Sequence, residues 1–307
     1  MTDQPYEMGF EICLIVTNVC QLNCNFCGRN ELSNKAKQEL HKDYMSVDTV
    51  KKILDNVDMS VVDSVSLTPV IGDLFLHKDA FEILDVLESD DRVDEITLTT
   101  NLLALSYLEI DKLLTYKKVH IVISMYGWDN ESYTQFTGRD MFNTFLSNLR
   151  HLYTFFVRTN SSLGIVFGLR QHPSDLYRNP SIKVIMQSLL TYDNVGMGEL
   201  EVDHHNFCGE TTKDGTIPEA TVRKGTCWYL MEGPAIYPNG DICYCPTDIH
   251  KKTKIGNVLT ETWEEITGKD SIYELIKQQQ ARGIYSGMCI GCSTWKHPDY
   301  RPMPWGN

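Results

Sequence analysis

The sequence contains no long apolar run: nothing among its 307 residues approaches the about 18 to 20 consecutive apolar residues needed to span a bilayer. Residues 1–10 also lack the basic segment and the apolar segment that begin a secretory signal. These two absences predict a cytoplasmic protein with no membrane partner.

Basic residues are scarce as well. The chain has 28 Lys and Arg against 41 Asp and Glu, for a formal net charge of −13. A broad basic surface that could neutralise a phosphate backbone is therefore not expected, and nucleic acid is excluded as a predicted partner. Hydrophobic residues at 42% and charged residues at 22% are ordinary for globular chains, so the protein should fold around a substantial core.

Cysteine, in contrast, is abundant, with ten residues. Reducing conditions in the cytoplasm oppose a disulfide framework, which makes metal binding the better explanation. Eight of the cysteines fall into two groups, one near the N-terminus and one in the last 81 residues, and only Cys13 and Cys208 lie outside them. The first comprises Cys20, Cys24 and Cys27, and the second Cys227, Cys243, Cys245, Cys289 and Cys292.

Short apolar or β-branched runs alternate with amphipathic segments between residues 10 and 205, which predicts an α/β fold of repeated strand-helix units around a parallel sheet. Right-handed crossovers would curl this sheet into a partial, TIM-like barrel. The expected strands are 12–17, 61–68, 95–100, 119–125, 163–169 and 199–202. The expected helices are 47–56, 80–88, 105–114, 142–155 and 182–190.

A second, smaller module is predicted after the barrel. Glycine, proline and aspartate are spread through residues 206–226, which indicates a linker between a barrel of residues 1–205 and a C-terminal domain of residues 227–307.

Two local signals lie in this C-terminal domain. The turn sequence Pro238-Asn239-Gly240 predicts a hairpin of strands 235–237 and 241–245, because Asn and Gly tolerate a positive φ. Thr262 and Glu265 form a capping-box pattern, which predicts a helix running to about residue 280.

The N-terminal cysteines directly follow the first expected strand, at the sheet edge where active sites of barrels gather. Three thiolates without a fourth can hold three irons of a [4Fe-4S] cluster and leave one iron open. Structural zinc normally takes four ligands in pairs, so zinc or unliganded core cysteines are the weaker alternatives.

The spacing Cys-x-x-x-Cys-x-x-Cys, with Phe26 before the last cysteine, resembles the signature of the radical S-adenosylmethionine (SAM) superfamily. The resemblance implies a partial (β/α)6 barrel in which SAM chelates the open iron. It also implies reductive cleavage of SAM to a 5′-deoxyadenosyl radical, which abstracts a hydrogen atom from a substrate.

Later segments fit the same family in order. Ile71-Gly72-Asp73 resembles its Gly-Gly-Glu motif, which meets the SAM amino group; the glycine and the acidic charge at Gly72 and Asp73 are kept, while Ile71 and Asp73 depart from the consensus. By the same resemblance Ser124 is a candidate ribose contact.

Phe26, Arg170 and Asn101 complete the set of candidate cofactor contacts. Arg170 would reach the SAM carboxylate through a charge-assisted pair, and Asn101 would contact SAM or substrate. The alternatives are a surface salt bridge for Arg170, a solvated turn for Ser124 and a helix cap for Asn101.

The C-terminal cysteines resemble the twitch domain, a shortened SPASM domain found behind some radical SAM barrels. The resemblance implies one auxiliary [4Fe-4S] cluster whose four irons are all held by protein, which gives two [4Fe-4S] clusters in the chain. Zinc on the same thiolates remains the alternative. Cys243 would share a strand face with Cys245, and the family pattern favours Cys245. The implied ligands are Cys227, Cys245, Cys289 and Cys292.

Cys208 follows the sixth expected strand, where the family has a turn at the rim of the active site. A thiol there can return a hydrogen atom to a substrate radical, and the alternative is a partly buried thiol in a turn.

A barrel followed by a twitch domain resembles radical SAM dehydrogenases and epimerases of cyclitols and aminoglycosides. We therefore expect an enzyme that oxidises or epimerises a small sugar-like substrate, with a reducing partner such as flavodoxin or ferredoxin. One alternative is a maturase of ribosomally made peptides, although Cys20 leaves little room before it for a peptide-binding domain. Another is a non-enzymatic iron-sulfur or zinc protein.

Overall fold

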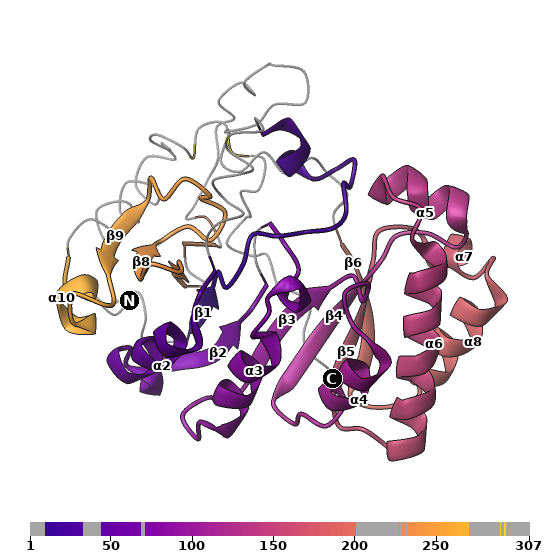
Figure 1. Ribbon diagram of the computed structural model, residues 1–307, viewed down its shortest axis with the longest axis horizontal. Helices are drawn as coiled ribbons and strands as arrows, with labels where there is room; N and C mark the ends of the chain where they lie inside the picture. The colour runs from indigo at the N-terminus through magenta and orange to yellow at the C-terminus, as the bar shows by residue number, and fades with distance from the viewer. Residues whose placement is uncertain are drawn as a thin grey trace.

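The computed structural model describes residues 10–32, 44–68, 71–200, 227, 229–230, 233–269, 289 and 292. Within these ranges the strands form one nine-stranded sheet with the order β6-β5-β4-β3-β2-β1-β7-β8-β9 (Figure 1). The six strands of the N-terminal part pair in parallel, which confirms the predicted α/β fold of partial-barrel type. They are β1 (Phe10–Leu14), β2 (Val62–Ser66), β3 (Ile96–Thr100), β4 (Val119–Met125), β5 (Gly164–Leu169) and β6 (Val195–Glu199).

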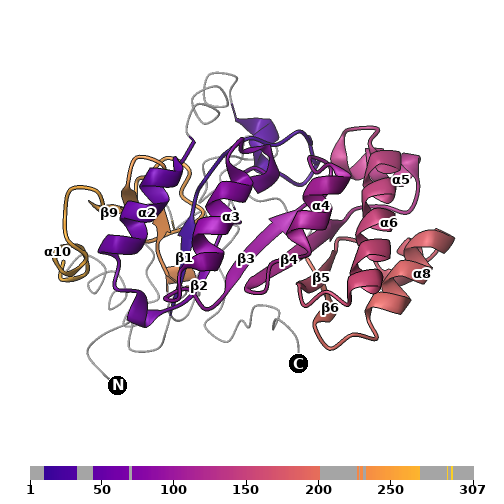
Figure 2. The same ribbon diagram turned by 60° about the horizontal axis from the view of Figure 1, so that its bottom comes forward.

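Helices cover one face of this sheet, as Figures 1 and 2 show. The five predicted helices are present, and α5 and α7 are additional short helices that the periodicity did not indicate. The α-helices are α2 (Val47–Asn56), α3 (Ala80–Ser89), α4 (Tyr107–Leu113), α5 (Asn130–Thr137), α6 (Phe142–Thr159), α7 (Pro173–Leu176) and α8 (Pro180–Leu189). Three single-turn 3-10 helices are η1 (Gly28–Glu31), η2 (Met59–Val61) and η3 (Leu74–Leu76). No helix in the described ranges is long and apolar enough to cross a membrane.

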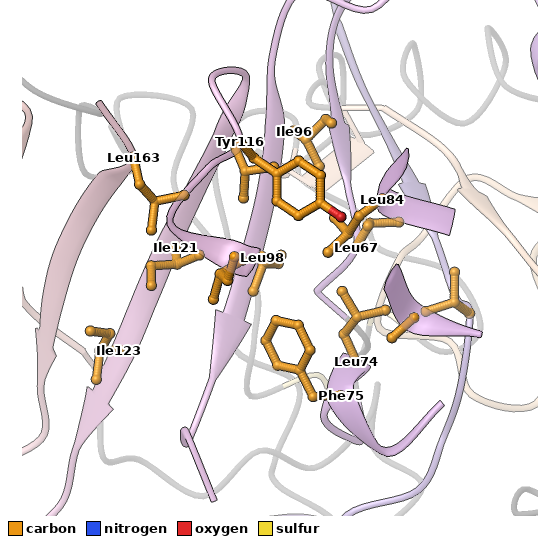
Figure 3. Close-up of a cluster of buried hydrophobic side chains, with 14 of the residues drawn as sticks. Leu67, Leu74, Phe75, Leu84, Ile96, Leu98, Tyr116, Ile121, Ile123 and Leu163 are labelled. Atoms are coloured by element: carbon orange, nitrogen blue, oxygen red, sulfur yellow. The ribbon is translucent and has the colours of Figure 1, made fainter. Parts of the chain in front are cut away.

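The core lies between the sheet and these helices. Leu98 of β3 and Ile121 of β4 are fully buried and face the same side as Leu84 of α3 (Figure 3). Because side chains alternate along a strand, the neighbours of these residues in their own strands, such as Thr97 beside Leu98, point to the opposite face. That opposite face is the inner surface of the partial barrel.

The sixth strand was predicted too late in the chain. It was expected at residues 199–202, but β6 spans Val195–Glu199 and pairs with β5 from Ile165↔Val195 to Leu169↔Glu199. Gly196 and Gly198 give this segment low strand propensity, and the ladder with β5 overrides that preference.

The C-terminal strands continue the sheet of the barrel. The predicted hairpin is present as β7 (Ala235–Ile236) and β8 (Asp241–Cys243), with Gly240 at φ +82° in the turn. β7 pairs in parallel with β1, and Cys13 lies opposite Ala235. A third C-terminal strand, β9 (Lys254–Asn257), was not predicted. The linker of residues 206–226 lies outside the described residues.

The C-terminal helix begins where it was predicted and ends earlier. α10 (Trp263–Thr267) has the full capping box of Thr262 and Glu265. It ends at Thr267, with Gly268 as its C-cap, and not near residue 280; glycine has low helix propensity.

Candidate functional site

The loop after β1 carries three cysteines, of which Cys24 is buried and Cys20 and Cys27 are partly buried. Cys24 is 8% exposed, and the Leu22 N–H donates to Cys20 Sγ at 3.4 Å. Burial raises the pKa of Cys20 to about 11 and of Cys24 to about 12, and the charges of Cys20 and Cys27 act on Cys24 in the same direction. Three thiolates in one loop repel one another unless a cation binds, so the donor set fits an iron cluster, whose binding displaces their protons.

The end of α5 holds this cysteine loop in place. The N–H groups of Asn23 and Asn25 donate to the carbonyls of Thr137 and Phe136, each at 2.9 Å. These carbonyls belong to the last helical turn, which leaves its acceptors without helical partners. Gly138 then turns the chain at φ +64°, and a Cβ there would lie 2.8 Å from the Asn23 carbonyl oxygen. The backbone of the cysteine loop is therefore hydrogen-bonded to, and packs closely against, the backbone at the end of α5.

Arg170 and Phe26 meet above the cysteine loop. The Arg170 guanidinium carbon lies 4.4 Å from the centre of the Phe26 ring, and Phe26 stacks on Tyr126 at 6.1 Å. Burial raises the pKa of Cys24, and the positive charge of Arg170 partly offsets that rise. Two residues predicted to contact SAM thus lie together beside the cysteines.

Asp73 and Asn101 tie the next two loops to the first. The buried Asp73 carboxylate accepts from Phe75 N–H at 3.1 Å, from Asn101 N–H at 2.9 Å and from the Thr100 hydroxyl at 3.0 Å. Asn101 Oδ1 in turn accepts from Gln21 Nε2 at 2.9 Å, inside the cysteine loop. The two predicted residues Asp73 and Asn101 are therefore brought together. Their side chains hydrogen-bond to the loops that surround the cysteines.

Gly72 and Ser124 also lie at this sheet edge. Gly72 has φ +140°, a conformation that favours glycine. Ser124, 2% exposed, lies on the inner face of β4 opposite Gly168 of β5, so it is a buried strand residue and not a solvated turn.

A polar cluster on the inner face was not predicted. Glu11 Oε2 accepts from Thr97 Oγ1 at 3.1 Å and from Ser64 Oγ at 3.4 Å, across three strands. Thr68 Oγ1 donates to Thr99 Oγ1 at 3.4 Å further along the same face. The hydroxyl residues of this cluster are visible in the sequence, since β2 and β3 both contain them among apolar residues. Their pairing with Glu11 is not.

The four cysteines implied for the auxiliary cluster are among the described residues, with Cys292 buried and the other three partly buried. Cys245 Sγ lies 3.2 Å from Thr247 Oγ1, and the Cys292 N–H donates to the Cys289 carbonyl at 3.4 Å. Cys243 is instead fully buried beside Cys13. In the described ranges no three His, Cys, Asp or Glu side chains converge on a single-ion site. Cys208 lies outside the described residues.

The loop after Cys245 reaches the N-terminal cysteine loop. Ile249 packs with Leu32 and Ile71, and Cys27 packs against the same small cluster. The Tyr237 hydroxyl donates to the Asp248 carbonyl and fixes this loop to β7. Contiguous packing therefore connects the two cysteine groups.

Comparison with known families decides what this arrangement is. The model of the radical SAM superfamily matches residues 14–178, more than half of the chain. The chain belongs to the radical SAM superfamily. Residues 227–293 match SPASM, an iron-sulfur cluster-binding domain. The cofactors of such a radical SAM enzyme are S-adenosylmethionine and [4Fe-4S] clusters, one in the barrel and a further one in the SPASM part.

Solved structures of radical SAM enzymes share the fold. Native anSMEcpe with bound AdoMet has 15% identity and a TM-score of 0.56, covering 87% of this chain and 83% of that one. Streptococcus suis SuiB bound to its precursor peptide SuiA has 14% identity and a TM-score of 0.56, covering 93% and 70%. BtrN in complex with AdoMet and 2-DOIA has 14% identity and a TM-score of 0.54, covering 89% and 87%. A search of curated proteins found no significant match.

Proposed function

We propose that this radical SAM enzyme oxidises or epimerises a carbon centre of a small polyhydroxylated molecule, sugar-like or cyclitol. The observation that carries the proposal is the hydroxyl-rich inner face of the barrel. Glu11, Ser64 and Thr97 already form a hydrogen-bonded group there, and Thr68 and Thr99 extend it toward the carboxyl ends of the strands. Such a surface offers a substrate hydroxyl both donors and acceptors.

The cysteine loop is the proposed site of the barrel cluster, with Cys20, Cys24 and Cys27 as its ligands. SAM bound to that cluster supplies, on reduction, the 5′-deoxyadenosyl radical that removes a hydrogen atom. An electron donor such as flavodoxin or ferredoxin is proposed as the partner that reduces it.

The side chains around this loop are proposed to bind SAM. Arg170, held over Phe26 by the cation–π contact, would pair with the SAM carboxylate. The backbone at Gly72 and the carboxyl of Asp73 would meet the amino group, and Ser124 and Asn101 would contact the ribose or the substrate. The buried setting strengthens each of these polar contacts.

The auxiliary cluster is proposed to lie on Cys227, Cys245, Cys289 and Cys292. A closed site of this kind suits oxidation, because a carbinol radical must give up a second electron to become a ketone. Epimerisation requires a hydrogen donor instead, and Cys208 is the proposed thiol for that role.

Peptide modification is the second candidate function. Its support is the similarity to SuiB, a fold neighbour whose structure contains a bound precursor peptide. The polar inner face distinguishes the two candidates, since a peptide would need side-chain pockets as well as hydroxyl contacts.

The assignments are tested by anaerobic reconstitution followed by addition of SAM and reductant. Wild-type protein should bind about eight irons per chain, from two clusters of four. A variant with Cys20, Cys24 and Cys27 changed to Ala should keep about four irons and form no 5′-deoxyadenosine. Four irons plus one zinc in the wild type would reject the auxiliary cluster.

Substrate class is tested by the rise in 5′-deoxyadenosine over the substrate-free level. Aminocyclitols and polyols should raise it, whereas ribosomal precursor peptides should leave it unchanged. The opposite ranking would favour the peptide function.

The choice between oxidation and epimerisation is tested with Cys208→Ala in deuterated water. Oxidation predicts that the variant keeps most activity. Solvent deuterium at a product carbon of the wild type, absent from the variant, would establish epimerisation and reject oxidation.

A further inference from the structure

Tyr133, on α5, is a buried residue whose polar atom the fold does not use. Its side chain is fully buried, and its hydroxyl has no hydrogen-bond partner among the described residues. A buried hydroxyl without a partner is costly, and native proteins rarely keep one unless something absent from the polypeptide satisfies it.

The surroundings of Tyr133 fix where its hydroxyl lies. The ring packs edge-on against Tyr126 at 5.9 Å and stacks on Phe145 at 5.6 Å. Gly127 allows this approach, because a Cβ there would lie 2.5 Å from the Tyr133 nitrogen. The Tyr133 ring is thus packed against the residues that follow β4, and its side chain has little freedom to rotate.

Tyr133 adjoins the cysteine loop through Tyr126, whose ring also stacks on Phe26 of that loop at 6.1 Å. Burial raises the pKa of the Tyr133 hydroxyl, and the negative charges of Cys24, Cys20 and Asp73 act in the same direction. The same helix holds the loop through the Asn23 N–H bond to Thr137 and the Asn25 N–H bond to Phe136, both at 2.9 Å. The unused donor and the cysteine loop therefore belong to one rigidly connected unit.

We propose that the Tyr133 hydroxyl donates a hydrogen bond to the sulfur ligands of the barrel cluster and so adjusts its reduction potential. The inference rests on the proposed assignment of Cys20, Cys24 and Cys27 as cluster ligands. Hydrogen bonds to cluster sulfurs favour the reduced form, which carries the additional negative charge. Tyr133 is accordingly a positioning residue that acts through Cys24 and Cys20, not a group that touches substrate.

The test is Tyr133→Phe in the full-length reconstituted protein without SAM, with the cluster midpoint followed by EPR during a redox titration. Loss of one hydrogen bond of about 1 kcal/mol should disfavour reduction about fivefold. For a one-electron couple, a tenfold change in the equilibrium constant corresponds to 59 mV. The midpoint potential of the cluster should therefore become about 40 mV more negative. The cluster-free variant should be at least as stable to urea as the wild type, because it loses only an unsatisfied hydroxyl.

Tyr116→Phe is the matched control. Tyr116 is also buried, but its hydroxyl donates to Asp85 Oδ1 at 2.7 Å on the helix side of the sheet. This variant should lose stability in the cluster-free protein and keep the wild-type midpoint.

Three results would overturn the proposal in different ways. An unchanged midpoint in Tyr133→Phe, or a loss of cluster-free stability equal to that of Tyr116→Phe, would make the hydroxyl structural. An unchanged midpoint with weaker SAM binding would assign the hydroxyl to SAM and not to the cluster. A wild-type chain with no cluster on Cys20, Cys24 and Cys27 would reject the cluster assignment as well.

Discussion

The carboxyl group of Asp73 is the point where the loops after β2 and β3 meet. Its two oxygens accept hydrogen bonds from two backbone N–H groups and one hydroxyl, and only 1% of the residue is exposed. An acid in the motif Ile71-Gly72-Asp73 therefore shapes the site by holding the loops, in addition to any contact that it makes with SAM.

Replacing this acid by its amide should destabilise the fold. In Asp73→Asn one acceptor oxygen becomes an NH₂ group that faces the N–H of Phe75 or of Asn101, so a buried donor loses its partner at a cost of about 1–3 kcal/mol. Urea unfolding of the cluster-free protein measures this cost. Asp58→Asn, at an exposed cap that accepts from Ser60, is the control and should change stability by less than about 0.5 kcal/mol.

The cost of Asp73→Asn should also depend on pH. Burial raises the pKa of Asp73 in the folded protein above its unfolded value. The folded state then holds its proton longer than the unfolded state does, so this contribution to stability is lost as pH rises through the folded pKa. The stability difference between wild type and Asp73→Asn should therefore shrink with increasing pH. A difference that widened would show that hydrogen bonding to the ionised form outweighs burial.

The sequence predicted some site residues well and others not at all. Asp73, Asn101 and Arg170 follow the parallel strands β2, β3 and β5, whose carboxyl ends lie at one edge of the sheet, so their position at that edge was predictable. Tyr133 was missed because its position depends on how α5 packs, which no motif encodes. Glu11 was missed because a single acid in an apolar strand gives no indication of which hydroxyls will face it.

Among the elements, α5 has the largest effect on the site for its size. It has eight residues, and its Asp129–Ser132 capping box and Gly138 end define it. Its sequence is mostly polar and shows weak periodicity, which is why it was not predicted, although the caps themselves are recognisable signals. The longer α2 and α6 were predicted because their apolar faces repeat over several turns.

Gly138→Ala should separate the cysteine loop from α5. A Cβ at φ +64° and 2.8 Å from the Asn23 carbonyl oxygen forces the backbone to move, at a cost of about 1–2 kcal/mol. Iron bound by the barrel site should fall, as measured by the EPR signal of that cluster per chain, while the auxiliary cluster stays filled.

Asn160→Ala is the control for this variant. Asn160 ends α6 at φ +49°, so the substitution carries a similar backbone cost at a helix end that makes no contact with residues 20–27 among the described hydrogen bonds. It should lower stability without lowering iron content. Equal loss of iron in both variants would show that general stability, not the contact of α5 with the loop, governs cluster binding.

At the scale of the molecule, the C-terminal strands and the barrel share one sheet. β7 lies against β1, and Ile12, Leu14, Ala235 and Ile236 are all fully buried. A chain that ends after residue 200 would expose the edge of β1, an apolar strand with unpaired backbone groups. We expect this fragment to aggregate when expressed alone, and to stay in solution as a 1:1 complex when residues 227–307 are co-expressed. Size-exclusion chromatography measures both outcomes, and a monomeric 1–200 fragment would contradict them.

The pairing of β1 with β7 also sets a delay during synthesis. Cys13 lies opposite Ala235, 222 positions later in the chain. At about 5–20 residues per second, a ribosome needs roughly 11–44 seconds to make the partner that β1 awaits. Throughout that time β1 has a neighbour on only one side, β2, and the contact of Ile249 beside Cys27 does not yet exist. In a nascent chain the three N-terminal thiols are therefore made long before the C-terminal residues that pack beside them. During this interval the thiols are accessible both to iron delivery and to oxidation by air.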